Sequence, residues 1–97
     1  MFVRVGTFRI RPGTLDEFQQ RYYAECAPLV RAASGSLDCM VLEPVDEQAP
    51  LAVCTVWQAE ADAAAYEASG AAADVVSRMR EFFLGPPELR SYRIRQP

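Results

Sequence analysis

The stretch LAVCTVWQAEADAAAYEAS, residues 51–69, decides the fold of this chain. Residues 51–57 are apolar and rich in β-branched side chains, which is typical of a buried strand. The alanine-rich residues 58–69 predict a helix that follows at once. The strand closes on Trp57, the only tryptophan, and the helix carries Tyr66. Two interpretations of this aromatic pair stay open: it lines a ligand pocket, or it fills a core.

The segments on either side extend this unit to a βαββαβ order. Strands are predicted over residues 2–10, 37–44, 51–57 and 89–95, and helices over residues 14–33, 58–69 and 73–83. The short polar loop between the second and third strands favours an antiparallel hairpin. The predicted fold class is α+β, a ferredoxin-like subunit with an antiparallel four-stranded sheet and its helices on one face. We expect residues 1–97 to form a single domain.

The first helix carries two local signals. Thr14 and Glu17 match the T-x-x-E capping box, so the helix is expected to begin there. Pro28 lies inside the same helix. We expect it to kink the helix or weaken its hydrogen bonding one turn earlier.

Both faces of the predicted sheet are apolar. In the third strand one alternation holds Leu51, Val53 and Trp57, and the other holds Ala52, Cys54 and Val56. The second strand is nearly the same, apart from Asp38. An antiparallel sheet with a solvated face normally alternates apolar and polar residues. Because the helices can cover only one face, we expect a second copy on the other, in a homodimer with packed sheets.

Composition excludes several function classes. The net charge of −3 argues against nucleic-acid binding, which needs a basic face. No apolar run approaches the ~20 residues of a membrane helix and no signal peptide is recognisable, so we expect no membrane partner and a cytoplasmic location. The ten basic residues are all arginine, and this bias with the many alanines suggests a GC-rich bacterial genome.

The reactive residue types are few. The chain has no histidine and no lysine, which excludes histidine bases, histidine metal or haem ligands, and lysine Schiff bases. The three cysteines show no C-x-x-C spacing. We interpret them as reduced core thiols, with a reactive thiol as the alternative. No metal is expected.

Three motifs together resemble the antibiotic biosynthesis monooxygenase-like (ABM) family. RIRPGTLDEF, residues 9–18, is similar to the family's strand, Pro-Gly turn and helix start, and ASGSLDCMVLEP, residues 33–44, to its second strand. Residues 51–69 resemble its third strand, tryptophan and alanine-rich helix. The resemblance implies a dimeric α+β barrel with a pocket between the sheet and the helices of each subunit. It also implies a cofactor-free monooxygenase that oxidises a planar polycyclic phenol or anthrone-like substrate with O₂.

The resemblance also implies site residues. Trp57 matches the family's pocket tryptophan, whereas Tyr66 stands where many members carry a histidine. Gly6 stands near an asparagine of the haem-degrading branch. Haem degradation is therefore disfavoured, although a tyrosinate-ligated haem stays as a minor alternative. A non-catalytic dimeric module that binds a small ligand, or is only structural, is the main alternative.

The candidate catalytic residues are Trp57 and Tyr66. The candidate substrate-binding residues are Tyr22, Thr55, Arg78, Phe82 and Phe83, for a small aromatic ligand and no cofactor. Each has an ordinary structural alternative: the aromatic residues as core, and the arginines as solvated charges. The arginines of the first and last strands, which should be neighbours, are likewise expected to pair with acids at the sheet edge. No obvious general base stands among the candidates.

Overall fold

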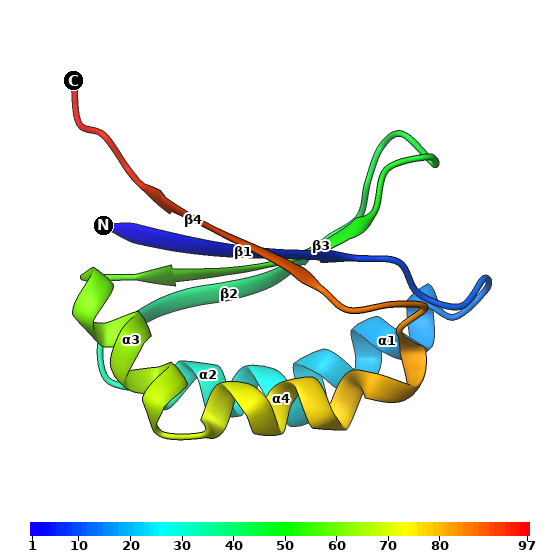
Figure 1. Cartoon of the computed structure of the whole chain (residues 1–97), viewed down its shortest axis with the longest axis horizontal. Coiled ribbons are helices and arrows are strands. Elements are labelled where there is room, and N and C mark those ends of the chain that lie inside the picture. The colour runs from blue at the N-terminus through cyan, green and yellow to red at the C-terminus, as the bar shows by residue number, and fades with distance from the viewer.

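The computed structural model describes residues 1–97 and confirms the ferredoxin-like α+β fold. Its strands are β1 (Phe2–Phe8), β2 (Ser36–Leu42), β3 (Leu51–Trp57) and β4 (Glu88–Arg93). They pair antiparallel in the order β2-β3-β1-β4. The helices lie together on one face of this sheet, and no element of the chain covers the other face (Figure 1).

The first predicted helix is three segments. These are α1 (Leu15–Arg21), a π-helical turn η1 (Tyr22–Cys26) and α2 (Ala27–Arg31). The π turn lies directly before Pro28, where a weakened hydrogen-bond ladder was expected, because proline has no N–H to donate to the preceding turn. The predicted capping box is wrong: the Thr14 hydroxyl donates instead to the Arg11 carbonyl at 2.5 Å, and no side chain caps α1.

The second helical layer is broken at Gly70, between the two helices predicted over residues 58–69 and 73–83. Helix α3 (Glu60–Ala68) and helix α4 (Ala71–Met79) meet at Gly70, whose φ of 87° is a left-handed conformation that glycine adopts without strain. A 3₁₀ turn, η2 (Arg80–Phe82), follows α4 and leads toward β4. The break lets α3 lie across the end of the sheet while α4 runs beneath it (Figure 1).

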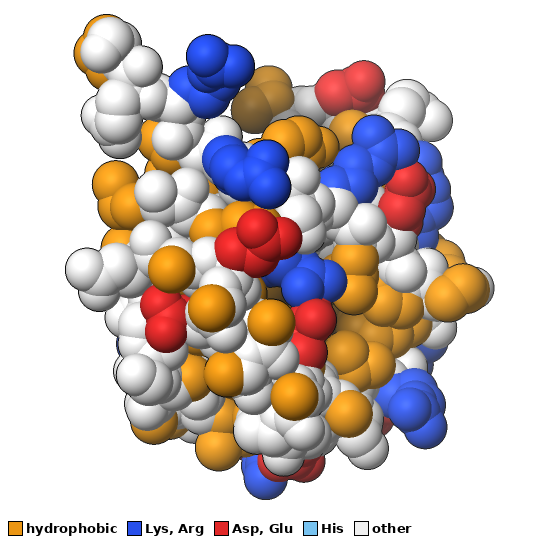
Figure 2. Space-filling view, turned by 60° about the vertical axis from the view of Figure 1, so that its left-hand side comes forward, with side chains coloured by type: hydrophobic (Ala, Val, Ile, Leu, Met, Phe, Trp, Pro, Cys, Tyr) orange, Lys and Arg blue, Asp and Glu red, His pale blue; other side chains and the backbone are white.

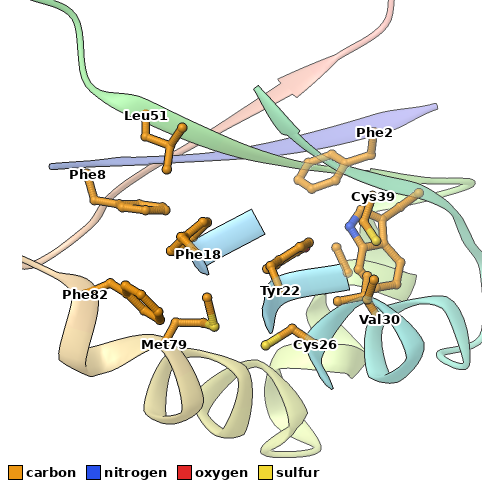
Figure 3. Close-up of a cluster of buried hydrophobic side chains, with 13 residues drawn as sticks. Phe2, Phe8, Phe18, Tyr22, Cys26, Val30, Cys39, Leu51, Met79 and Phe82 are labelled. Carbon is orange, nitrogen blue, oxygen red and sulfur yellow. The ribbon is translucent and has the colours of Figure 1, made fainter. Parts of the chain in front are cut away.

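The core lies between the sheet and the helices. Figure 3 shows Phe8 and Leu51 from the sheet above Phe18, Tyr22 and Met79 from the helices, with Phe82 at one end. Aromatic rings make up much of it: the Phe18 ring lies 5.5 Å from the Phe8 ring and 5.5 Å from the Phe82 ring, between centroids. A chain this short buries a smaller fraction of its surface than a longer chain does, and large aromatic rings supply much of the apolar area that it does bury.

The opposite face of the sheet is also apolar. The strand registers place on it side chains from all four strands: Val3, Val5, Thr7, Asp38, Met40, Leu42, Ala52, Cys54, Val56, Glu88, Arg90 and Tyr92, with the charged ones on the edge strands β2 and β4. Leu42 and Tyr92 are exposed.

None of the helices is both long enough and apolar enough to span a membrane.

The backbone of Gly35 lies in close contact with the first turn of α3. Gly35 has a φ of 80°, and a Cβ added to it would lie 2.6 Å from the Cβ of Asp62, in the first turn of α3. The Gly35 carbonyl also accepts a hydrogen bond of 2.9 Å from the Gln58 N–H. Only glycine allows this approach of α3 to the start of β2.

We therefore expect Gly35→Ala to lower the free energy of unfolding by at least about 2 kcal/mol, since it adds a steric clash to left-handed strain. Gly13→Ala is the matched control, because Gly13 has a φ of 79° but no atom within 4 Å of the added Cβ. That variant should lose only about 1 kcal/mol. Urea unfolding followed by circular dichroism measures both values, and equal losses would contradict the close-contact argument.

Candidate functional site

A cavity of about 150 Å³ lies between the sheet and the helices. Figure 2 shows apolar side chains gathered in a hollow on one face of the molecule, with acidic and basic side chains beside it. The lining is mostly apolar, with a few polar groups, and comes from the strands and both helical layers: Arg4, Gly6, Phe8, Phe18, Tyr22, Val30, Val53, Thr55, Trp57, Ala63, Tyr66, Glu67, Ala72, Val75, Val76, Met79, Phe83, Pro87 and Leu89. Apolar concave sites with a few polar groups are typical of small-molecule binding.

Trp57 and Tyr66 meet in this lining. Trp57 is 1% exposed, and its ring centroid lies 5.1 Å from that of Tyr66, with 38° between the ring planes. The indole N–H donates to the Thr55 hydroxyl at 2.9 Å, because residues two apart on β3 share a face. This hydrogen bond fixes the plane of the indole, and the tilted pair forms an aromatic wall of the cavity.

Tyr22 brings an unpaired hydroxyl to the same lining. Its side chain is 2% exposed, and its hydroxyl lies near the Cys39 thiol, a weak partner, but makes no hydrogen bond of normal geometry. Burial, with the nearby Cys39 thiol, holds the pKa of this hydroxyl well above its ordinary value. A buried hydroxyl without a partner is destabilising unless another group, such as an oxygen atom of a ligand, accepts a hydrogen bond from it.

Both tyrosines of the lining are hydrogen-bond donors at neutral pH. Burial raises the pKa of Tyr66 to about 12. A phenol with a raised pKa stays protonated, so neither Tyr22 nor Tyr66 serves as a proton acceptor. They can instead stabilise an oxyanion by donating to it.

Two of the seven candidate site residues lie outside the cavity. Arg78 faces Asp74 of α4 at 3.3 Å and Glu25 of η1 at 3.6 Å, so its charge is paired outside the cavity. Phe82 is completely buried, in the core and beneath the Arg21 guanidinium, which lies 4.9 Å from the ring centroid. Its neighbour Phe83 does line the cavity. Adjacent residues point in different directions here because η2 ends at Phe82.

Two charged residues of the lining were not among the candidates. Arg4 on β1 and Glu67 on α3 form an ion pair, and both side chains line the cavity. Arg4 was interpreted as a sheet-edge charge. The signal for it was the alternation of β1, which puts Arg4 on the same face as Phe2 and Phe8. Glu67 had no signal beyond its place next to Tyr66.

The three cysteines, Cys26, Cys39 and Cys54, are buried free thiols. Burial raises the pKa of Cys26 to about 11 and also raises the pKa of Cys54. A thiol with a raised pKa is a poor nucleophile at neutral pH. This agrees with the interpretation of these residues as core thiols.

Comparisons with known proteins give one family and one fold. The family model described as antibiotic biosynthesis monooxygenase matches residues 1–78. No curated protein matches the chain in sequence.

Several solved structures share the fold. SnoaB, a cofactor-independent oxygenase from Streptomyces nogalater, is 17% identical with a TM-score of 0.78, over 99% of this chain and 94% of its own. MhuD, solved with two manganese protoporphyrin IX molecules bound per active site, is 21% identical with a TM-score of 0.78, over 100% and 97%. A conserved protein from Methanosarcina mazei is 16% identical with a TM-score of 0.78, over 97% and 92%.

The unpaired Tyr22 hydroxyl yields a test with a matched control. Tyr22→Phe should raise the free energy of unfolding of the ligand-free protein by about 1 kcal/mol, because it removes an unsatisfied buried group. Tyr23→Phe should lower it by about 1 kcal/mol, because the Tyr23 hydroxyl accepts a 2.9 Å hydrogen bond from the Val41 N–H. Urea unfolding measures both changes. A loss of stability in Tyr22→Phe would mean that its hydroxyl has a partner after all.

Proposed function

The chain belongs to the antibiotic biosynthesis monooxygenase family, and from this premise we propose that it is a cofactor-independent monooxygenase. Its substrate is a planar polycyclic phenol or anthrone-like compound, oxidised with O₂ in the cavity between sheet and helices. The observation that carries the proposal is the Trp57–Tyr66 pair in a largely apolar lining. The functional unit is the single domain of residues 1–97.

The shape and chemistry of the cavity support a flat aromatic ligand. Apolar cavities of about 150 Å³ accommodate a ring the size of benzene, so one ring of the substrate is buried and the others extend toward the opening. The tilted rings of Trp57 and Tyr66, 5.1 Å apart, offer faces for stacking. Phe83 adds a further aromatic wall.

The reaction needs little from the protein beyond binding and charge stabilisation. An electron-rich phenolate passes an electron to O₂, and the resulting radical pair recombines without a metal or an organic cofactor. The protein must hold the ring, favour its anion and exclude water. Tyr22 and Tyr66 would donate hydrogen bonds to the anion, Trp57 would stack on the ring, and Thr55 would hold the indole in place.

Two comparisons bear on this choice. SnoaB is described as a cofactor-independent oxygenase, and its likeness to this chain supports the proposal. MhuD binds a metalloporphyrin, but this chain has no histidine to ligate a haem iron. The alternative function is a passive ligand-binding module, which would use the same cavity without consuming O₂.

The function is tested by O₂ uptake with a tricyclic hydroxyanthrone. Tyr66→Phe should lower kcat/KM about 100-fold, the effect of removing one oxyanion donor. Trp57→Phe should raise KM about tenfold through weaker stacking. Tyr92→Phe is the control, since Tyr92 lies on the opposite face of the sheet.

Two outcomes would contradict the oxygenase, and a third would contradict only the role of Tyr66. Binding of phenols with no O₂ uptake would favour the passive module. A Soret band in the purified protein would indicate bound haem. Equal activity of Tyr66→Phe and Tyr92→Phe would remove the proposed role of Tyr66.

We also propose that the apolar face of the sheet packs against the same face of a second copy. The face spans all four strands, its charges Asp38, Glu88 and Arg90 lie only on the edge strands β2 and β4, and the helices lie on the other side. Burial of a continuous apolar face of this kind is typical of permanent homodimers. The partner of the protein would therefore be a second copy of the chain, held in an isologous contact.

Light scattering after size exclusion should give a mass twice that of the 10.8 kDa subunit. Val5→Glu should give the single-subunit mass, because it places a charge in the middle of the apolar face. Leu84→Glu is the control: Leu84 is an exposed apolar residue outside the strands, and its substitution should leave the mass unchanged. A wild-type protein of single-subunit mass would overturn the dimer.

A further inference from the structure

We propose that Arg4 and Glu67 form the polar end of the cavity and select a substrate with an ionisable ring hydroxyl. Glu67 takes the proton of that hydroxyl, and Arg4 holds the oxyanion that forms. The reaction step rests on the oxygenase function proposed above, whereas the selection of the hydroxyl does not depend on it.

The pair is built from two elements that face each other across the cavity. Arg4 lies on β1, opposite Thr55 of β3 and Ser91 of β4, and Glu67 lies on α3 directly after Tyr66. The Arg4 side chain is 23% exposed and that of Glu67 is 43% exposed. Both therefore contact the apolar lining and solvent at once, as expected for groups at a pocket opening.

A second ion pair shows what a purely structural contact in this region looks like. Arg93 of β4 faces Glu60 of α3 at 3.5 Å, so it too joins the sheet to α3. Neither residue lines the cavity. Exposed ion pairs of this kind contribute only about 0–1 kcal/mol to stability, so tying α3 to the sheet does not by itself account for a pair placed at the opening of the cavity.

The chemistry of the lining singles out the two groups. Glu67 is its only carboxylate and Arg4 its only cation. Tyr22 and Tyr66 stay protonated and donate hydrogen bonds. Arginine does not give up its proton and binds oxyanions by charge-assisted hydrogen bonds. Glu67 is thus the group of the lining suited to accept a proton. It would serve as the general base, a role that none of the aromatic candidates can take.

The surroundings of Glu67 favour the proton transfer because Arg4 exchanges one anionic partner for another. Arg4 faces it from β1, Tyr66 lies beside it on α3, and Asp74 of α4 contributes negative charge near Tyr66. When Glu67 takes the substrate proton, Arg4 loses its carboxylate partner and gains the substrate oxyanion. The net charge of the site is unchanged, so the transfer does not leave an uncompensated charge beside the apolar wall.

The atoms and electrons balance with O₂ as the oxidant. Glu67 accepts the hydroxyl proton, and the ring anion gives one electron to O₂, forming a ring radical and superoxide. Their recombination forms a C–O bond at the activated ring carbon, and protonated Glu67 returns its proton to the peroxide. Where that carbon still bears hydrogen, as in an anthrone, the hydroperoxide loses water and leaves a quinone carbonyl.

The selection is tested by ligand binding, with Trp57 as the reporter. It is the only tryptophan and it lines the cavity, so quenching of its fluorescence follows binding of 9-anthrol-type hydroxyarenes and of their methyl ethers. Arg4→Gln should weaken binding of the hydroxyarene about tenfold, the loss of one charge-assisted hydrogen bond. Binding of the methyl ether, which has no proton to lose, should change less than about twofold.

Glu60→Gln is the matched control, since it breaks the neighbouring ion pair outside the cavity. It should leave both affinities at the wild-type values. Equal weakening of the hydroxyarene and the ether in Arg4→Gln would overturn the selection, and so would the same change in Glu60→Gln.

The proton transfer is tested by O₂ uptake. At neutral pH, Glu67→Gln should lower kcat about 100-fold, the usual contribution of a general base. The loss should shrink toward pH values of about 10, where a phenol ionises in water without a base. A loss that is the same at every pH would show a structural role, and an unchanged kcat would remove the base.

The two sets of measurements separate the proposals. If wild-type protein consumes no O₂ but Arg4→Gln loses its preference for the hydroxyarene, the oxygenase fails and the hydroxyl-selecting site stands. If O₂ uptake occurs and both variants behave as wild type, the site fails and the oxygenase stands.

Discussion

The sheet has two apolar faces, but the helices of the chain cover only one of them. The rest of the structure depends on this constraint. Along β3 each residue alternates between the faces, so Leu51 and Trp57 turn toward the helices while Cys54 turns away. The helical face receives the aromatic core, and the other face has no cover within the chain. The proposed substrate cavity and the proposed contact with a second copy therefore lie on opposite sides of the same four strands. A change on one side does not have to disturb the other.

The cavity exists because the second helical layer is built from small residues. Around Tyr66, helix α3 offers mainly alanine, and Gly70 turns the chain before the larger residues of α4 begin. Alanine does not fill the space that the tilt of the helices opens beneath the sheet. The large rings that do reach this space, Trp57 and Tyr66, line it and do not fill it. A core of a chain this short would normally be packed without such a gap.

The sequence predicted the architecture well because the pattern of the strands and helices is local. The order of elements, the break at Gly70 and the antiparallel pairing follow from periodicity and turn residues. The capping box failed because Thr14 has a nearer acceptor in the Arg11 carbonyl of the preceding turn. The cavity lining was predicted in part. Thr55 and Trp57 lie on the same face of β3, and Tyr66 lies on the helix that follows this strand. Which charges enter the lining depends on how α3 crosses β1, and that crossing is not written in either segment alone.

The π-helical turn between α1 and α2 has a consequence for how the first helix tolerates change. Residues 22–26 wind more loosely than their neighbours, so one turn there holds an extra residue. The direction of the Tyr22 side chain is thus governed by the length of the backbone between Leu15 and Pro28. Point substitutions leave that length intact, whereas removal of a single residue would tighten the spiral and swing every side chain upstream of it around the axis. Natural variation in this segment is expected to keep its residue count constant and to exchange freely only the exposed side chains, such as Ala24 and Glu25.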